Sequence, residues 1–204
     1  MSDGDLREGR IRAAMAGHVG DESSARASLT SDDPPSRCLA LGALERLNSL
    51  SAPELRTALN DPSASVRRRA LEITARRSDV NARCCLTDSD PSVAEAAAFA
   101  VGEQLDSEAV RALIEMAERH DDALCRESAV AALGVLASSS DVDGEAILGC
   151  LIGAMNDKAQ IRRRSLLGLF QFDDPQAQKA MEEALVDTDR QVRSIAADLL
   201  GVVD

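Results

Sequence analysis

Few side chains in this sequence of 204 residues could act as catalysts or metal ligands. The two histidines are His18 and His120, and neither stands in a His-Glu dipeptide. The five cysteines form no CxxC motif, and neighbouring helical residues point about 100° apart, so an adjacent pair is a poor metal site. We therefore expect small, buried thiols in a reducing compartment. The cysteines are Cys38, Cys84, Cys85, Cys125 and Cys150.

Motifs of common enzyme classes are also missing. The sequence contains no G-x-S-x-G, no P-loop and no dinucleotide-binding fingerprint. The stretch DVDGE at 141–145 resembles part of a calcium loop, but it lacks an acidic position and the terminal glutamate, so it is better explained as a turn. We expect no enzymatic activity, no cofactor and no bound metal.

Charge and composition exclude further classes of function. The formal net charge is −12, and residues 103–204 carry 20 acids against 10 bases. Aromatic residues are limited to three phenylalanines. Such a chain is a poor match to nucleic acid or to an anionic membrane. No apolar run reaches the roughly 18 residues of a membrane span, and the charged N-terminus has no signal-peptide pattern. We expect a cytoplasmic monomer.

A phrase of about fifteen residues recurs along the chain, most clearly as DPSASVRRRALEITA at 61–75. Its apolar residues are three and four positions apart, which predicts an amphipathic helix after a turn. The residue that precedes the arginine marks each copy. Successive markers are 30, 27, 32, 36 and 31 residues apart, a length that suits two short helices and two turns. The markers are Ser36, Val66, Val93, Cys125, Ile161 and Val192.

These copies predict one domain, residues 1–204, that is built from about six helix pairs. A first helix at 5–17 precedes the pairs and would cap the apolar end of the stack. We expect the pairs at 21–47, 52–77, 80–104, 106–137, 145–171 and 175–203. In the third pair, the first helix is expected at 80–87.

The phrase resembles the HEAT-like repeats of the phycobilisome-lyase type. The resemblance rests on the D-P turn, on Val66-Arg67 with Ala70, and on the later copies VRSIAADLLG at 192–201 and CRESAVAALG at 125–134. It covers about residues 21–203 and implies an all-α, right-handed α-solenoid. It does not imply one function, because this repeat serves many unrelated tasks.

The resemblance also implies a role for the arginine after each marker. In such repeats this arginine pairs with the aspartate of a turn, since a guanidinium can hold a carboxylate in fixed geometry. We expect a structural ladder with a gap at Ala94; the alternative is a binding stripe. The predicted ladder consists of Arg37, Arg67, Arg126, Arg162 and Arg193 with turn residues such as Asp33, Asp61, Asp122, Asp157 and Asp189.

A partner would meet the second helix of each pair on the concave surface. At 100° per residue, positions +2, +6 and +9 from the marker lie opposite the core. Large apolar residues among charges favour an unidentified protein or peptide as the partner. Two alternatives stay open: the phenylalanines could be tucked between helices, and the protein could act on a prosthetic group in a chaperone-like role or as phycobilin lyases do. The candidate residues are Arg68, Glu72, Glu95, Phe99, Glu127, Arg163, Leu167, Phe170 and Asp198.

Overall fold

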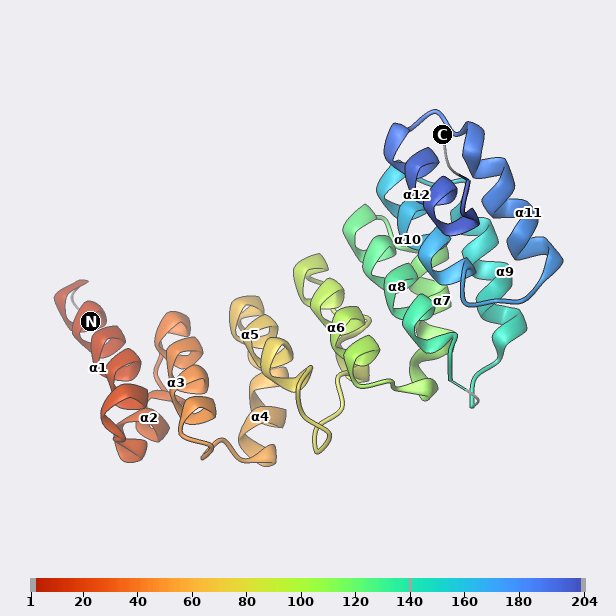
Figure 1. Cartoon of the computed structure of the whole chain (residues 1–204). Helices are drawn as coiled ribbons and strands as arrows, with labels where there is room; N and C mark the ends of the chain where they lie inside the picture. Colours follow the sequence, from red (N-terminus) through yellow and green to blue (C-terminus); the bar gives the residue numbers. More distant parts are fainter. Residues whose placement is uncertain (1–2, 140, 203–204) are drawn as a thin grey trace. The chain divides into compact units, whose positions relative to one another are not determined.

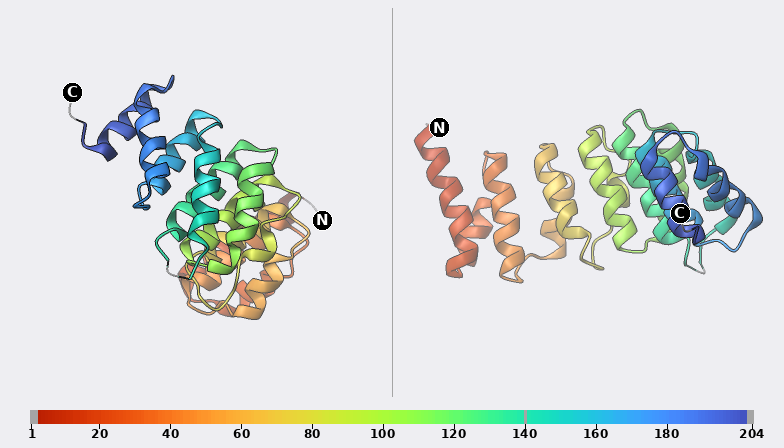
Figure 2. Two further views of the ribbon diagram at one scale, coloured as in Figure 1. Left: turned by 90° about the vertical axis from the view of Figure 1, so that its right-hand side faces the viewer. Right: turned by 45° about the horizontal axis from the view of Figure 1, so that its top comes forward.

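The computed structural model of the protein describes residues 3–139 and 141–202. Within these ranges every regular element is a helix, and the helices follow one another in antiparallel pairs (Figures 1 and 2). The chain divides into two compact units, Met1–Cys85 and Leu86–Asp204. Each unit is a stack of helix pairs, and the chain is an all-helical α-solenoid.

The first unit contains three long helices that pack side by side, with two shorter helices behind them (Figure 1). Helix α1 packs against α3, and α3 packs against α5. Helix α2 contacts α1 and α3, whereas α4 packs against α5. The bounds are Asp3–Val19 for α1, Glu22–Ser28 for α2, Pro34–Arg46 for α3, Ala52–Leu59 for α4 and Ala64–Thr74 for α5, followed by the 3₁₀ turn η1 at Arg83–Cys85.

The second unit repeats this plan. Helices α6, α8, α10 and α12 follow one another in one layer, and α7, α9 and α11 form the other layer. Short 3₁₀ turns, η2 at Ser107–Ala109 and η3 at Ala184–Val186, adjoin α7 and α11. The bounds are Pro91–Glu103 for α6, Val110–Arg119 for α7, Ala123–Leu136 for α8, Gly144–Ala154 for α9, Ala159–Leu169 for α10, Pro175–Glu183 for α11 and Arg190–Leu200 for α12.

The second helices bury the face that the sequence pattern predicts. All six marker residues are buried, and the residue four positions later is fully buried in every copy. These later residues are small, which lets neighbouring helices approach closely. Aspartates cap the N-termini of most of these helices by accepting hydrogen bonds from backbone N–H groups. The small buried residues are Ala40, Ala70, Ala97, Ala129, Ser165 and Ala196.

The third predicted pair differs from expectation in its first helix. Residues 80–87 form no α-helix; the 3₁₀ turn Arg83–Cys85 takes its place. Asn81 accepts a hydrogen bond from the Arg83 backbone at 2.7 Å, and Asp and Ser residues flank the segment on both sides. Such side chains compete for backbone groups, and a stretch this short cannot offset the cost of helix nucleation. The turn also leaves Cys84 exposed, contrary to the expected burial.

Helix α5 also starts later than the phrase suggests. Its N-cap is Ser63, without a side-chain cap, rather than Asp61. The carboxylate of Asp61 instead accepts two hydrogen bonds from Arg37 and one from the Ser63 backbone. The aspartate of this turn therefore joins two repeats, and the helix begins two residues after it.

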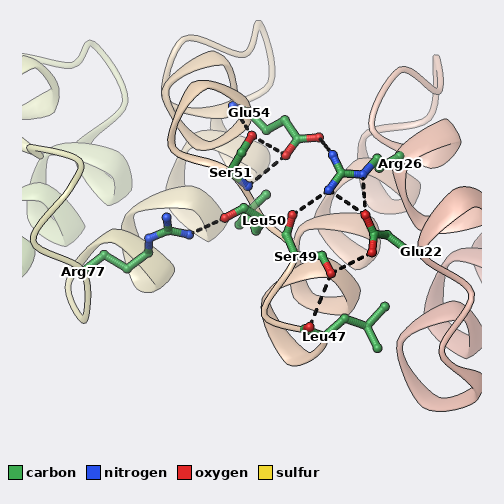
Figure 3. A network of polar contacts seen from close by, with 8 residues as sticks. All are labelled: Glu22, Arg26, Leu47, Ser49, Leu50, Ser51, Glu54 and Arg77. Carbon is green, nitrogen blue, oxygen red and sulfur yellow. Dashed lines mark hydrogen bonds and ion pairs between the residues drawn. The ribbon is translucent and has the colours of Figure 1, made fainter.

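A polar network holds the shorter helices of the first unit in place (Figure 3). Arg26 on α2 binds the Glu54 carboxylate on α4 at 2.8 Å, the Ser49 carbonyl at 2.8 Å and Glu22 at 3.0 Å. Glu54 also completes a capping box with Ser51 at the start of α4. The single guanidinium thus joins α2, the turn after α3 and the N-terminus of α4.

Arginines on α1, α3, α8 and α10 connect successive repeats within each unit. In each pair, Nε and Nη2 of the arginine bind the two carboxylate oxygens of an aspartate in the next repeat, at 2.6–3.0 Å. Such a bidentate pair fixes the relative orientation of the two side chains and adds to their charge attraction. The pairs are Arg10–Asp33, Arg37–Asp61, Arg126–Asp157 and Arg162–Asp187.

Two predicted members of the ladder make different contacts. Arg193 donates to the Asp187 carbonyl at 2.6 Å, and Arg67 donates to the Asp61 carbonyl at 2.8 Å. Asp189 caps α12, so the carboxylate that pairs with the preceding repeat is that of Asp187, two residues earlier. At the predicted gap, Ala94 is fully buried and offers no charge.

Candidate binding groove

Helices α6, α8 and α10 lie side by side in the second unit and approach closely through small residues (Figure 1). A Cβ atom on Gly134 of α8 would lie 3.0 Å from the Gly168 Cα atom of α10. A Cβ atom on Gly102 of α6 would lie 3.1 Å from the Ala132 Cβ atom of α8. These contacts leave a low floor of small residues, above which larger side chains can form walls.

Two adjoining cavities lie over this floor, and together we call them the groove. One cavity, of about 360 Å³, lies over α8 and α10, and the other, of about 290 Å³, lies over α6 and α8. Ala131, Val135 and Arg164 line both cavities, so the two lie next to each other.

Three large apolar side chains stand on the walls of the groove. Phe99 is 56% exposed, Val135 is 49% exposed and Leu167 is 45% exposed. They come from three successive helices, α6, α8 and α10, and they line the cavities just described. Exposed apolar residues that gather around one concavity are typical of a surface that contacts a partner.

Charge is distributed unevenly along the groove. The cavity over α6 and α8 is lined by Glu95, Glu103 and Glu127, whereas the cavity over α8 and α10 contains no acidic residue. Arg164 on α10 approaches Glu127 on α8 at 3.3 Å and offsets its charge. Among the residues that the structure describes, the hydrogen bond given for Glu95 is a long one, from Ser128 at 3.5 Å, so the α6 end of the groove keeps excess negative charge.

Four of the nine candidate residues lie together in this groove: Glu95, Phe99, Glu127 and Leu167. Phe170, the C-cap of α10, is 53% exposed but lines neither cavity. The exposure of the two phenylalanines decides the open alternative, because neither is tucked between helices.

The other candidates lie outside the groove. Arg163 points toward Asp189 at 3.9 Å. Arg68 and Glu72 are exposed on α5 in the first unit, where they approach each other at 3.8 Å. Asp198 is exposed on α12, beside a wide, shallow cavity of about 750 Å³ that Arg190 and Arg193 also line.

Sequence reasoning missed Val135, Glu103 and Arg164 as members of the groove, whereas Ala131 stands at one of the expected positions, six residues after its marker. Val135 and Glu103 are ten residues after their markers, and Arg164 is three residues after its marker. These positions lie about 40–100° from the arc centred on +2, +6 and +9. The sequence did contain a signal for these positions. The ladder arginine at +1 faces a neighbouring repeat, so the packed side of each second helix is centred between the marker and +1, and the exposed side is rotated by the same angle.

The described residues offer little material for other kinds of site. Among residues 3–139 and 141–202, no three His, Cys, Asp or Glu side chains gather as a metal site would require. Burial raises the pKa of the Cys125 and Cys150 thiols to about 11, so both stay protonated at neutral pH. No described helix is both long enough and apolar enough to cross a membrane.

Comparisons with known proteins place the chain in a structural class. The fold is that of a helical repeat protein, an α-solenoid. No protein-family model matches the sequence, and a search of curated proteins found no match either.

Several solved structures are similar. An engineered protein matches with a TM-score of 0.67 and 20% identity, over 89% of this chain and 97% of that chain. A designed armadillo repeat protein in complex with the peptide (KR)4 matches with a TM-score of 0.59 and 14% identity, over 98% of this chain and 99% of that chain. A chain from a structure of Kap95p bound to RanGDP matches with a TM-score of 0.52 and 9% identity, over 91% of this chain and 36% of that chain. At these identities the likeness concerns the fold alone.

Proposed function

We propose that this protein is a non-catalytic interaction module that binds a protein or peptide segment in the groove over α6, α8 and α10. The observation that carries the proposal is the gathering of Phe99, Val135 and Leu167 around two adjoining cavities. Burying three such side chains against a partner is worth several kcal/mol before the costs of association. The designed armadillo repeat protein holds a peptide, which supports this kind of ligand.

Two finer parts of the proposal rest on the sequence. The repeats are of the HEAT-like kind, supported by the D-P turns and by the arginine after the marker. The protein works in the cytoplasm as a monomer, supported by the acidic charge and the use of cysteine.

A selection from random twelve-residue peptides displayed on phage tests the groove without knowledge of the natural partner. Peptides enriched on the wild type should bind the variants Phe99→Ala and Leu167→Asp at least about tenfold more weakly, since the first removes an anchoring ring and the second places a charge against an apolar anchor. The matched control is Phe170→Asp, because Phe170 is as exposed as Phe99 but lies outside the groove. The control should bind like the wild type.

Two outcomes contradict the proposal. Enriched peptides that bind all variants equally would place the binding surface elsewhere on the protein. A loss with Phe170→Asp but not with Leu167→Asp would move the surface toward the end of α10. Circular dichroism should confirm that each variant keeps the helix content of the wild type.

A further inference from the structure

The two cavities of the groove differ in chemistry, and this difference concerns the kind of segment that the groove accepts. Along α6, Glu95, Phe99 and Glu103 are four residues apart, so they form one stripe on the helix surface. All three line the cavity over α6 and α8. The exposed ring of Phe99 therefore has a carboxylate about one helical turn before it and another one turn after it.

Such a stripe matches a basic side chain. A guanidinium or ammonium group is attracted to the face of an aromatic ring, and nearby carboxylates add hydrogen bonds. In the structure, no arginine or lysine forms an ion pair with Glu95 or Glu103 among the described residues. Arg164 is the basic residue that lines this cavity, and its guanidinium is placed against Glu127.

The cavity over α8 and α10 has the opposite character. Ala131, Gly134, Val135, Leu167 and Gly168 line most of it, with Ser138 and Gln171 at the side. Because no carboxylate lines this cavity, it provides no charged partner for a basic side chain, but it can bury an apolar side chain. The ion pair between Arg164 and Glu127 lies where the two cavities join.

We propose that the groove selects a peptide segment in which an arginine or lysine, seated on Phe99 between Glu95 and Glu103, lies near a large apolar residue that fills the cavity beside Leu167. The inference rests on the proposed function of the groove. The two cavities lie over successive pairs of helices, so their centres are one helix spacing apart, about 8–10 Å. Because an extended chain rises about 3.3 Å per residue, the two anchor residues are about three positions apart.

An array of synthetic peptides tests the inference directly. Each twelve-residue peptide has a Gly-Ser background with one arginine and one leucine that are two to five positions apart. Matched peptides carry glutamate or serine in place of the arginine, or serine in place of the leucine. Binding of the labelled wild-type protein is measured on the array, and affinities are then measured by fluorescence anisotropy. We expect the strongest binding with both anchors at a separation near three.

Variants of the protein assign each preference to one end of the groove. The double substitution Glu95→Gln/Glu103→Gln should weaken the binding of arginine-containing peptides about fivefold and leave the preference for leucine intact. Glu115→Gln/Glu145→Gln removes the same charge from exposed positions on α7 and α9 and should change little. Leu167→Asp should remove the preference for leucine.

The outcomes separate the inference from the function on which it rests. Binding that needs leucine and Leu167, but is equal for arginine, serine and glutamate peptides, would overturn the inference and keep the binding groove. Equal arginine binding by wild type and Glu95→Gln/Glu103→Gln would also overturn the inference. Peptide binding that ignores Leu167, or no binding by any peptide, would overturn both.

Discussion

At the residue scale, bidentate arginine–aspartate pairs join successive repeats. Arg162 and Asp187 are typical: both side chains are largely buried, and two hydrogen bonds of 2.8 and 2.6 Å join them. The hydrogen bond from Arg162 lowers the pKa of Asp187, although burial opposes the shift. The same guanidinium also binds the carbonyl of Asp157, so one side chain fixes its own turn and the next repeat.

We predict that Asp187→Asn destabilises the protein by about 1–3 kcal/mol at pH 7, because Arg162 then loses a charged partner. A carboxyl whose pKa is lowered in the folded state stabilises it above the unfolded pKa of about 3.9, and that contribution disappears as the pH falls through the folded pKa. The difference in unfolding free energy between wild type and variant should therefore shrink below about pH 4. Urea unfolding at several pH values measures it.

The exposed acid Asp173 supplies the control for this measurement. Asp173→Asn removes one negative charge from the loop before α11 and should alter the unfolding free energy by less than about 0.5 kcal/mol. If the difference in unfolding free energy between wild type and Asp187→Asn stayed constant down to pH 3, the ion pair would not contribute to stability as described.

At the element scale, close contact between helices α8 and α10 depends on glycine. A Cβ atom on Gly168 would lie 2.8 Å from a methyl group of Leu151 and 3.0 Å from the Gly134 Cα atom. Alanine normally stabilises a helix relative to glycine by up to about 1 kcal/mol. At this position the overlap should exceed that gain, because the second contact is with backbone that cannot move aside.

We predict that Gly168→Ala lowers the free energy of unfolding by about 1–3 kcal/mol. Gly149 on α9 is the matched control, since it lies inside a helix and a Cβ atom there would meet nothing within 4 Å. Gly149→Ala should raise the free energy of unfolding by about 0.5–1 kcal/mol. Denaturant unfolding of both variants tests the pair; stabilisation by Gly168→Ala would mean that the helices are not in close contact.

At the scale of the whole molecule, negative charge is concentrated in the second unit. Residues 86–204 carry 23 acids and 10 bases, whereas residues 1–85 carry 12 acids and 13 bases. The formal net charges are −13 and +1. A field of one sign attracts an oppositely charged ligand over several ångströms and speeds its association.

We predict that the association rate constant of the arginine–leucine peptide falls at least about threefold when NaCl rises from about 50 to 300 mM, while its dissociation rate changes less. Stopped-flow fluorescence measures both rates. The peptide with serine in place of arginine is the control and should show little dependence on salt. An association rate that is insensitive to salt would argue that the charge of the second unit plays no part in binding.

The sequence by itself determined the repeat architecture. Helix period, turn residues and marker spacing are local properties, so the pairs expected at 21–47, 80–104, 106–137 and 145–171 end within two residues of the ends of α3, α6, α8 and α10. The buried face followed for the same reason, because helical geometry relates positions three and four apart whatever the surroundings. The segment 80–87 was the exception, since its few residues gave no period.

Only the tertiary structure decided which side chains form the groove and which aspartates join the repeats. Phe99 and Leu167 are both six residues after their markers, as expected, but Arg164 and Val135 enter the groove because neighbouring helices set the rotation of each helix. Asp187 rather than Asp189 meets Arg162 for a similar reason: two turn carboxylates compete, and the chain path places one at the helix N-terminus and the other beside the guanidinium. Such choices depend on residues about 25–35 positions away, which a local pattern does not contain.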